Sequence, residues 1–344
     1  MKAFKLTGLR QMALADVPDP VIAADTDVLV KMASVGVCGS DVHYYKDGKI
    51  GTQVVEFPWT VGHEGSGVVE QIGAAAKRVR VGDRIAFDPL MPCWKCDQCL
   101  AGRPHTCRNI VFLGCPQQAE GCLSEYIALP ETSCFPIPPE MTFNEATLSE
   151  PLSIGLYAAK LASDLRGAEI GILGAGPIGL CVLLAARTMG VGKTYVTDKI
   201  DARLKVADQL GADWVGSAAS GDAAADLAHR QGGQLDVVFE CCGQQEALDQ
   251  AVDLLKPGGE LALVGIPQPD RISFNINSLR RKEIRIRNVR RQNGCVQRSL
   301  DMIAHHEVNI GPLVTHRFPF SETDRAFDLA GGYRDGVVKA MIEF

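Results

Sequence analysis

The stretch that decides the fold is 169-EIGILGAGPIGLCVLLAARTMG-190. An apolar run of strand length passes through GAGPIG into an apolar run of helix length, which is the order of a dinucleotide-binding unit. There Gly174 permits the tight turn, Gly176 lets the backbone approach a pyrophosphate, and Gly179 allows close helix–strand packing. The helix N-terminus offers unpaired N–H groups to the phosphates, and a proline suits its first turn. The candidate cofactor-binding residues at this turn are Gly174, Gly176, Pro177, Ile178 and Gly179.

Beyond Pro151 the same alternation of strand and helix recurs. Strands are expected at 169–174, 194–198, 235–243 and 260–265, and helices at 177–190, 201–211 and 245–259. Strands that alternate with helices of this length predict a parallel, doubly wound sheet.

Asp198 ends the second of these strands, about twenty residues after the glycines, where a carboxylate binds the ribose hydroxyls of NAD and repels the extra phosphate of NADP. The alternative for Asp198 is a helix N-cap. Arg203, one turn into the next helix, either softens the preference for NAD or is a surface residue.

The first 150 residues have a different character, with short β-like runs between glycines and prolines at 27–37, 65–73, 81–87 and 123–129. They predict antiparallel strands in a barrel-like body, and the tail from about 288 returns to short mixed elements. A chain of 344 residues is expected to form two domains.

The composition is that of an ordinary globular protein, with 46% hydrophobic and 22% charged residues. A net charge of −6 argues against nucleic acid or an anionic membrane as a partner, and the basic stretch 280-RRKEIRIRNVRR-291 is interpreted as a solvated strand face. The N-terminus lacks an apolar signal core, and the apolar run 170–186 is short and broken by glycines. We therefore expect a cytoplasmic protein.

Four of the twelve cysteines lie within 91-MPCWKCDQCLAGRPHTC-107. Polar residues separate them, which argues against packing in a core, and this spacing lets one loop wrap an ion. Zinc held by four thiolates has no vacancy for substrate, so the site is expected to be structural. Its ligands are predicted to be Cys93, Cys96, Cys99 and Cys107.

A catalytic zinc needs mixed ligands and an open position. The chain offers Cys38, His63, Glu64 and Glu150 for such a site. Taken singly, each has an ordinary alternative. Cys38 could be a core thiol and His63 a buried histidine, while Glu64 could be a charge at a strand edge and Glu150 a helix cap.

Several motifs together resemble the zinc-dependent medium-chain dehydrogenases, and most closely their polyol branch of sorbitol and xylitol dehydrogenases. They are 37-VCGSDVHYY-45, 62-GHEGSGVVE-70, the four-cysteine loop, 149-SEPLSIG-155, GAGPIG and 314-VTHRFP-319. The resemblance implies an α/β fold in which a Rossmann doubly wound parallel sheet is inserted into a mainly β, GroES-like catalytic domain. The implied ranges are 1–149 with a structural zinc lobe at about 90–110, then 150–287 for NAD, then 288–344 returning to the catalytic domain.

The resemblance also implies reversible oxidation of a secondary hydroxyl of a polyol to a ketose, with hydride transfer to NAD. It implies two zinc ions per chain, the catalytic one held by Cys38, His63 and either Glu64 or Glu150. By the same resemblance, Ser40 is expected to take the proton from the substrate hydroxyl and His43 to pass it outward.

Substrate candidates by resemblance are Tyr44, Glu150 and Arg290. Relatives commonly carry an aromatic residue where this chain has Arg291, and a pair of arginines suits a carboxylate. Alternation along a strand argues that the two do not both point into the site.

The alternatives are a sugar-acid 5-dehydrogenase acting on idonate-like substrates, an L-threonine 3-dehydrogenase and, last, a non-catalytic NAD-binding protein. A homo-oligomer, tetramer or dimer, is implied as well, and an apolar edge strand around 272–276 is a candidate for its interface.

Overall fold

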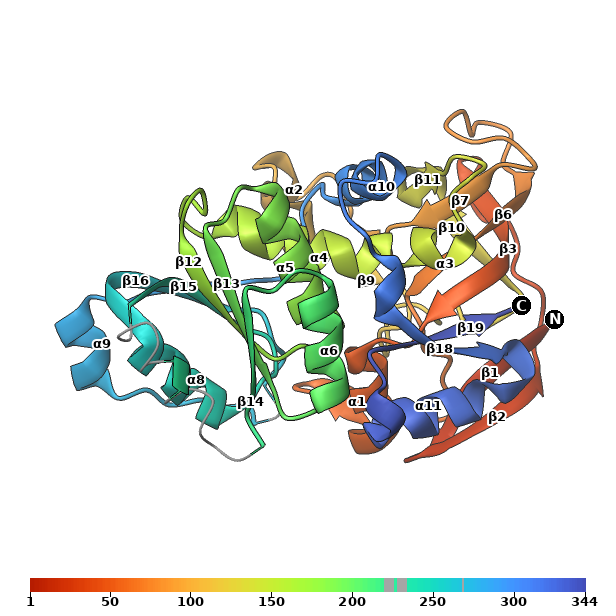
Figure 1. Ribbon diagram of the computed structural model, residues 1–344. Coiled ribbons are helices and arrows are strands. Elements are labelled where there is room, and N and C mark those ends of the chain that lie inside the picture. The colour runs from red at the N-terminus through yellow and green to blue at the C-terminus, as the bar shows by residue number, and fades with distance from the viewer. Residues whose placement is uncertain (220–225, 228–233, 268) are drawn as a thin grey trace. The chain divides into compact units, whose positions relative to one another are not determined.

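A computed structural model describes residues 1–219, 226–227, 234–267 and 269–344 (Figure 1). The chain divides into two compact units. The first unit comprises Met1–Glu150, Val296–His305 and Val314–Phe344, and the second comprises Pro151–Cys295 and His306–Leu313.

The second unit is built on a six-stranded sheet whose neighbouring strands are all parallel. In spatial order the strands are β14 (Trp214–Ser217), β13 (Lys193–Asp198), β12 (Glu169–Leu173), β15 (Leu235–Glu240), β16 (Leu255–Leu263) and β17 (Arg285–Asn288). Numbered along the chain this order is 3-2-1-4-5-6, that of a dinucleotide-binding doubly wound sheet, in which the ligand crevice lies where the order reverses. The predicted parallel sheet is confirmed, and its reversal lies between β12 and β15.

The three predicted helices form as α5 (Pro177–Thr188), α6 (Asp201–Gln209) and α8 (Gln245–Leu254). The described residues of this unit also include two helices that were not predicted, α4 (Ser149–Leu161, which begins in the first unit) and α9 (Ile276–Lys282). Ile170 and Ile172 on β12 are fully buried, as is Leu183 on α5, because a central parallel strand is covered on both faces.

Two local predictions in this unit are wrong. The helix expected over 245–259 ends at Leu254, and β16 begins at once with Leu255. The edge strand expected at 272–276 does not form, because the Asn275 side chain accepts hydrogen bonds from the Asn277 and Ser278 amides and starts α9 at Ile276. The edge of the sheet is β17.

The basic stretch 280–291 contains the end of α9 and the exposed strand β17. Lys282 donates to the carbonyls of Val252, Asp253 and Leu255 and so caps the end of α8. Arg285 and Arg287 lie beside the buried Glu260. A solvated strand is thus confirmed for β17, and the basic residues have structural partners.

The first unit is mainly β. Its largest sheet has seven strands in the order β11-β7-β6-β3-β19-β18, with β10 also pairing β3. The bounds are β3 (Asp27–Gly36), β6 (Glu64–Ile72), β7 (Arg84–Phe87), β10 (Tyr126–Pro130), β11 (Cys134–Pro136), β18 (Val314–Pro319) and β19 (Lys339–Glu343). The chain's last strand, β19, lies beside β3 (Figure 1), so the tail completes a sheet begun by the N-terminal part.

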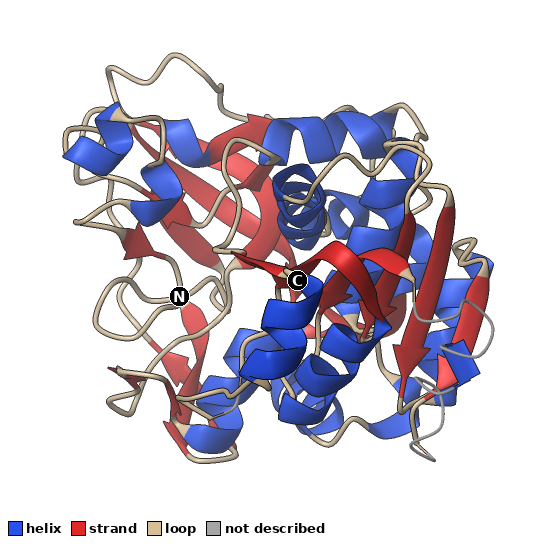
Figure 2. Cartoon of the chain, turned by 90° about the vertical axis from the view of Figure 1, so that its left-hand side faces the viewer, coloured by secondary structure: helices blue, strands red, loops and turns tan. Residues whose placement is uncertain are grey.

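Shorter elements complete the first unit, and long connections surround the labelled N-terminus (tan in Figure 2). They include β1 (Lys2–Gly8), β2 (Gln11–Asp16), α1 (Gly39–Asp47), β8 (Leu90–Met91), α2 (Asp97–Leu100), β9 (Val111–Phe112), α3 (Phe143–Thr147), α10 (Val296–Ala304) and α11 (Thr323–Gly331). The apolar core includes Val30, Ile85, Leu123 and Phe327. In the described part of the chain, no helix is long and apolar enough to cross a membrane.

Candidate active site

A mixed group of metal-ligating side chains lies at the end of β3. Cys38 lies two residues after the end of that strand, and Gly36 pairs with Glu64 at the start of β6. This pairing brings two distant segments together, so the ligand atoms of Cys38, His63 and Glu64 all lie within 4.8 Å of one another. A thiolate, an imidazole and a carboxylate are the donors of an open, catalytic zinc site.

Asp41, which the sequence reasoning missed, orients this group. Its buried carboxylate lies 3.3 Å from His63 Nδ1 and accepts hydrogen bonds from the Gly62 and Cys38 amides. An Nδ1 contact of this kind leaves Nε2 of His63 to bind a metal. Burial lowers the pKa of His63, but Asp41 and Cys38 outweigh it and hold that pKa well above its usual value. The signal for Asp41 was its place three residues after Cys38 in one motif.

Lys339 was also missed. It is fully buried on β19, and its Nζ lies 2.7 Å from each carboxylate oxygen of Glu64. Burial lowers the pKa of Lys339, but Glu64 and then Cys38 raise it more, so it lies above the ordinary lysine value. The available signal was a single charge inside the apolar run 337-VVKAMI-342.

Glu150 lies in the first turn of α4, within the first unit, and is buried. Burial raises its pKa to about 8, with Glu64 and Asp88 adding to the rise while His63 and Lys339 oppose it. The compact group contains Glu64 and not Glu150. The protonation of Glu150 therefore depends on His63 and Glu64, two members of the mixed group.

The predicted relay residues lie on α1. Ser40 Oγ donates to Cys38 Sγ at 3.4 Å, which places its hydroxyl beside the mixed group. His43 has a side chain 30% exposed, with Nδ1 3.3 Å from Asp47. Tyr44 is buried, and its hydroxyl donates to Gln53 at 3.2 Å. Ser40 thus faces the metal ligands, whereas His43 reaches solvent.

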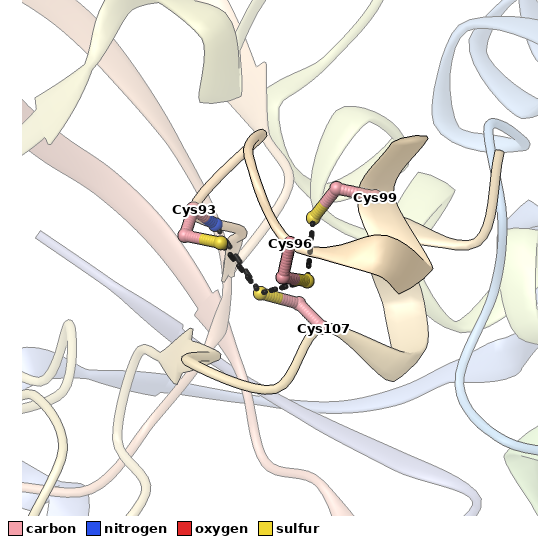
Figure 3. A group of neighbouring side chains, drawn as sticks. All are labelled: Cys93, Cys96, Cys99 and Cys107. Carbon is pink, nitrogen blue, oxygen red and sulfur yellow. Dashed lines mark hydrogen bonds between the residues drawn. The ribbon is translucent and has the colours of Figure 1, made fainter. Parts of the chain in front are cut away.

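The second group consists of four thiols in one loop (Figure 3). Cys93 and Cys107 have sulfurs 3.4 Å apart, and Cys96 Sγ lies 3.6 Å from Cys99 and 3.8 Å from Cys107. Sulfurs placed tetrahedrally about 2.3 Å from zinc are ~3.8 Å apart, so the group fits that ion. The Lys95 amide and neighbouring donors lower the pKa of Cys93 to about 6, whereas burial and the neighbouring thiols raise the pKa of Cys99 to about 12.

The cofactor turn has the geometry that its glycines predict. Gly174 has φ +106°, and Gly176 is the N-cap of α5. A Cβ on Gly179 would lie 1.8 Å from the Gly174 carbonyl oxygen, so only glycine fits there. Arg203 reaches this turn, since its guanidinium lies 3.7 Å from the position of a Cβ on Gly176. These residues stand at the carboxyl end of β12, beside the reversal of strand order.

Asp198 supports the same turn. Its carboxylate accepts hydrogen bonds from the Ala175 amide at 2.7 Å and the Ile200 amide at 2.8 Å. The N-cap of α6 is Ile200, so the alternative that Asp198 is the helix cap is wrong.

Arg290 and Arg291 follow β17 in the second unit, and Arg290 is exposed while Arg291 is partly buried. The argument from strand alternation is wrong here, because β17 ends at Asn288 and Arg291 has a left-handed backbone with φ +53°.

Family comparisons agree with this geometry. Residues 24–139 match the model of the alcohol dehydrogenase GroES-like domain, and residues 177–305 match that of the zinc-binding dehydrogenases. A sorbitol dehydrogenase of Bacillus subtilis is 33% identical over 343 residues, covering 99% of this chain and 97% of that protein. The chain belongs to the zinc-dependent medium-chain dehydrogenase family.

Human sorbitol dehydrogenase is 35% identical over 316 residues, or 91% of this chain and 87% of the human protein. The solved L-idonate 5-dehydrogenase of Escherichia coli superposes with a TM-score of 0.91 at 25% identity, covering 100% of this chain and 98% of the other. The predicted fold class, a Rossmann sheet with a GroES-like domain, is confirmed. This chain is a zinc-dependent alcohol dehydrogenase, and zinc and a nicotinamide dinucleotide are its cofactors.

Proposed function

We propose that this dehydrogenase oxidises a secondary hydroxyl of a polyol to a ketose, reversibly, at the mixed group of Cys38, His63 and Glu64, with Glu150 as the alternative carboxylate. The observation that carries the proposal is the convergence of a thiol, an imidazole and a carboxylate within 4.8 Å. This donor set leaves room for a substrate hydroxyl, as a catalytic zinc requires. Zinc, when bound there, supplies the Lewis acidity that lowers the pKa of an alcohol.

The proton of that hydroxyl needs a path to water. Ser40 lies against Cys38 and accepts it, and the partly exposed His43 releases it to solvent. A histidine suits this task because its ordinary pKa is close to neutral pH. Asp41 holds the His63 ring in the orientation that ligation needs.

Four thiolates at Cys93, Cys96, Cys99 and Cys107 form, on this proposal, a structural zinc site. Their coordination shell is closed, so its contribution is to the stability of residues 93–107.

NAD is the proposed dinucleotide. Asp198 accepts a hydrogen bond from the Ala175 amide at the cofactor turn, which Arg203 also reaches, and its charge there favours ribose hydroxyls over a phosphate. Asp198→Ala is expected to raise the KM for NAD by about 10–100-fold, the loss of a charged hydrogen bond, and to improve NADP turnover. Asp201→Ala is the matched control, because Asp201 is a nearby carboxylate at the first position of α6. NADP turnover above NAD turnover in the unaltered enzyme would refute the assignment.

The substrate class rests on the likeness to sorbitol dehydrogenases. Tyr44, Glu150 and Arg290 are the proposed substrate residues. A sugar acid is the second candidate, favoured by the Arg290–Arg291 pair and the likeness to an idonate dehydrogenase. A panel of hexitols, pentitols, aldonates and threonine, followed by NADH absorbance, tests both. The highest kcat/KM is expected for a polyol. A higher kcat/KM for aldonates would refute the polyol assignment and favour a sugar-acid dehydrogenase.

An oligomer that pairs through the exposed edge strand β17 is also proposed, with light scattering after size exclusion as its test. The twelve cysteines, all free of disulfides, favour a reducing compartment such as the cytoplasm.

A further inference from the structure

Glu240 is a buried carboxylate at the last position of β15, one of the two strands at which the strand order reverses. It is 1% exposed, and its Oε1 accepts hydrogen bonds from the Cys242 amide at 2.8 Å and the Gly243 amide at 2.5 Å. No ion pair of the described residues includes Glu240, whereas the buried Glu260 of β16 lies beside Arg287. A buried charge without a cation depends on hydrogen bonds, so this carboxylate and the turn at 241–243 stabilise each other.

The turn held by this carboxylate, residues 241–243, packs against the cofactor turn. The Cys241 amide donates to the Leu173 carbonyl at 2.8 Å, and a Cβ on Gly174 would lie 3.1 Å from the Cβ of Cys242. The two turns follow neighbouring parallel strands, and a dinucleotide binds at the carboxyl ends of such strands where their order reverses. Residues 241–243 therefore lie where the dinucleotide is expected.

The turn after β16 is in contact with the same residue. The backbone carbonyl of Glu240 accepts hydrogen bonds from the Val264 amide at 2.9 Å and the Gly265 amide at 2.8 Å. A Cβ on Gly265 would lie 2.5 Å from the Gly243 nitrogen and 2.9 Å from Glu240 Oε2. The Glu240 side chain thus fills the contact between two turns at the carboxyl edge of the sheet.

We propose that Glu240 is a positioning residue for the dinucleotide, and that its carboxylate holds residues 241–243 in the conformation that receives the cofactor. Its bonds also occupy the Cys242 and Gly243 amides, two donors that would otherwise compete for a phosphate. The pyrophosphate is left to the N-terminus of α5. This task concerns affinity for the cofactor and is independent of the substrate, so it goes beyond the proposed function.

Glu240→Met removes the acceptor and fills a similar volume. The turn then has the binding conformation in only a fraction of the molecules, and the apparent dissociation constant rises in inverse proportion to that fraction. Loss of a hydrogen bond to a charged acceptor is expected to raise this constant by about 10-fold or more. The kcat at saturating dinucleotide is expected to stay unchanged, the pattern of a lost contribution to binding alone.

Glu240→Gln tests whether the hydrogen bonds are the cause. Its side-chain carbonyl still accepts from the two amides, although a neutral acceptor makes weaker bonds than a carboxylate. Dinucleotide affinity in Glu240→Gln is therefore expected to lie between that of Glu240→Met and that of the unaltered enzyme.

The experiment is a fluorescence titration of the zinc-loaded enzyme with NADH and with NADPH. The variants are then compared with the dinucleotide that the unaltered enzyme binds more tightly. Glu260→Met is the matched control, because Glu260 is also fully buried but accepts from Ser163 and lies beside Arg287. Weaker binding in Glu240→Met, partial recovery in Glu240→Gln and unchanged binding in Glu260→Met are the expected results.

Melting temperatures of the variants separate positioning from a merely structural role. Both Met variants are expected to melt at a lower temperature than the unaltered enzyme, because each loses buried hydrogen bonds. Dinucleotide affinity in Glu240→Met equal to that in Glu260→Met would overturn the inference. Affinity in Glu240→Gln no better than in Glu240→Met would overturn it as well.

If Glu240→Met does not fold, the unaltered enzyme decides. Cys242 is exposed and belongs to the turn that Glu240 holds. NADH is expected to slow its alkylation by iodoacetamide, followed at Cys242 by peptide mass spectrometry. An unchanged rate would show that the turn lies away from the cofactor and would overturn the inference. An unaltered enzyme that binds neither NADH nor NADPH would instead refute the cofactor site, which distinguishes the two failures.

Discussion

The two metal-ligand groups of this chain differ in how they are built. The thiol group gathers Cys93, Cys96, Cys99 and Cys107 from one loop of fifteen residues. The mixed group takes Cys38 from the residue before α1 and His63 and Glu64 from the start of β6, and Lys339 of the last strand contacts Glu64. A local loop needs only its own turns to form, whereas the mixed group exists only when β3, β6 and β19 pair. The difference teaches that the group most visible in a sequence is the one least coupled to the fold around it.

His63→Ala is expected to separate the two groups most sharply. Loss of a Lewis acid worth several kcal/mol lowers kcat/KM by about 1000-fold or more, with one zinc lost per chain. Activity is followed by NADH absorbance and metal by elemental analysis. Circular dichroism controls for folding. Near-normal activity in His63→Ala would show that the mixed group is not the site of the reaction.

The relay variants are expected to have the next largest effect. Ser40→Ala and His43→Asn each remove one step of the proton path, and such steps are worth about 100-fold or more in kcat. Zinc content is expected to stay unchanged, because neither side chain is a proposed ligand. A loss of zinc in either variant would show a role in ligation instead.

Asp41→Asn tests the support behind His63. Replacing a group that orients a metal ligand weakens metal binding by about 10–100-fold, so activity is expected to recover when zinc is added in excess. Asp16→Asn, which alters an exposed ion pair with Lys2, is the control. Activity that excess zinc does not restore would contradict an orienting role.

Cys99→Ser is expected to have the smallest effect on the reaction and the largest on stability. Loss of a structural metal lowers the free energy of unfolding by about 4 kcal/mol. A loss of this size lowers the melting temperature by roughly 10 °C in a domain of this size. Below that temperature kcat is expected to change by less than about threefold. A kcat reduced as strongly as in His63→Ala would erase the distinction between the groups.

The sequence predicted the parts of this molecule that depend on local chemistry. The glycine turn at 174–179, the strand–helix alternation after it and the four-thiol loop all follow from residues close together in the chain. Cys38, His63 and Glu64 were predicted as a set because they lie in familiar motifs, since spacing alone does not place residue 38 against residue 63.

The rest depended on pairing between distant strands. Lys339 lies 275 residues from Glu64 in the sequence, and only the pairing of β19 with β3 brings the chain's end to the site. Competing local interactions explain the errors at 272–276 and 290–291, where an Asn cap and a left-handed residue replaced the expected strand.

The central claim is that the chemistry belongs to the mixed group. Its most direct test is a stepwise removal of zinc during which the number of reactive thiols and the dehydrogenase activity are both measured. The mixed group holds one thiol, Cys38, and the loop holds four. We predict that activity disappears with the loss of one zinc per chain as one new thiol becomes reactive, and returns when that zinc is restored. Activity that persists at this stage, and disappears only as the four loop thiols become reactive, would contradict the account.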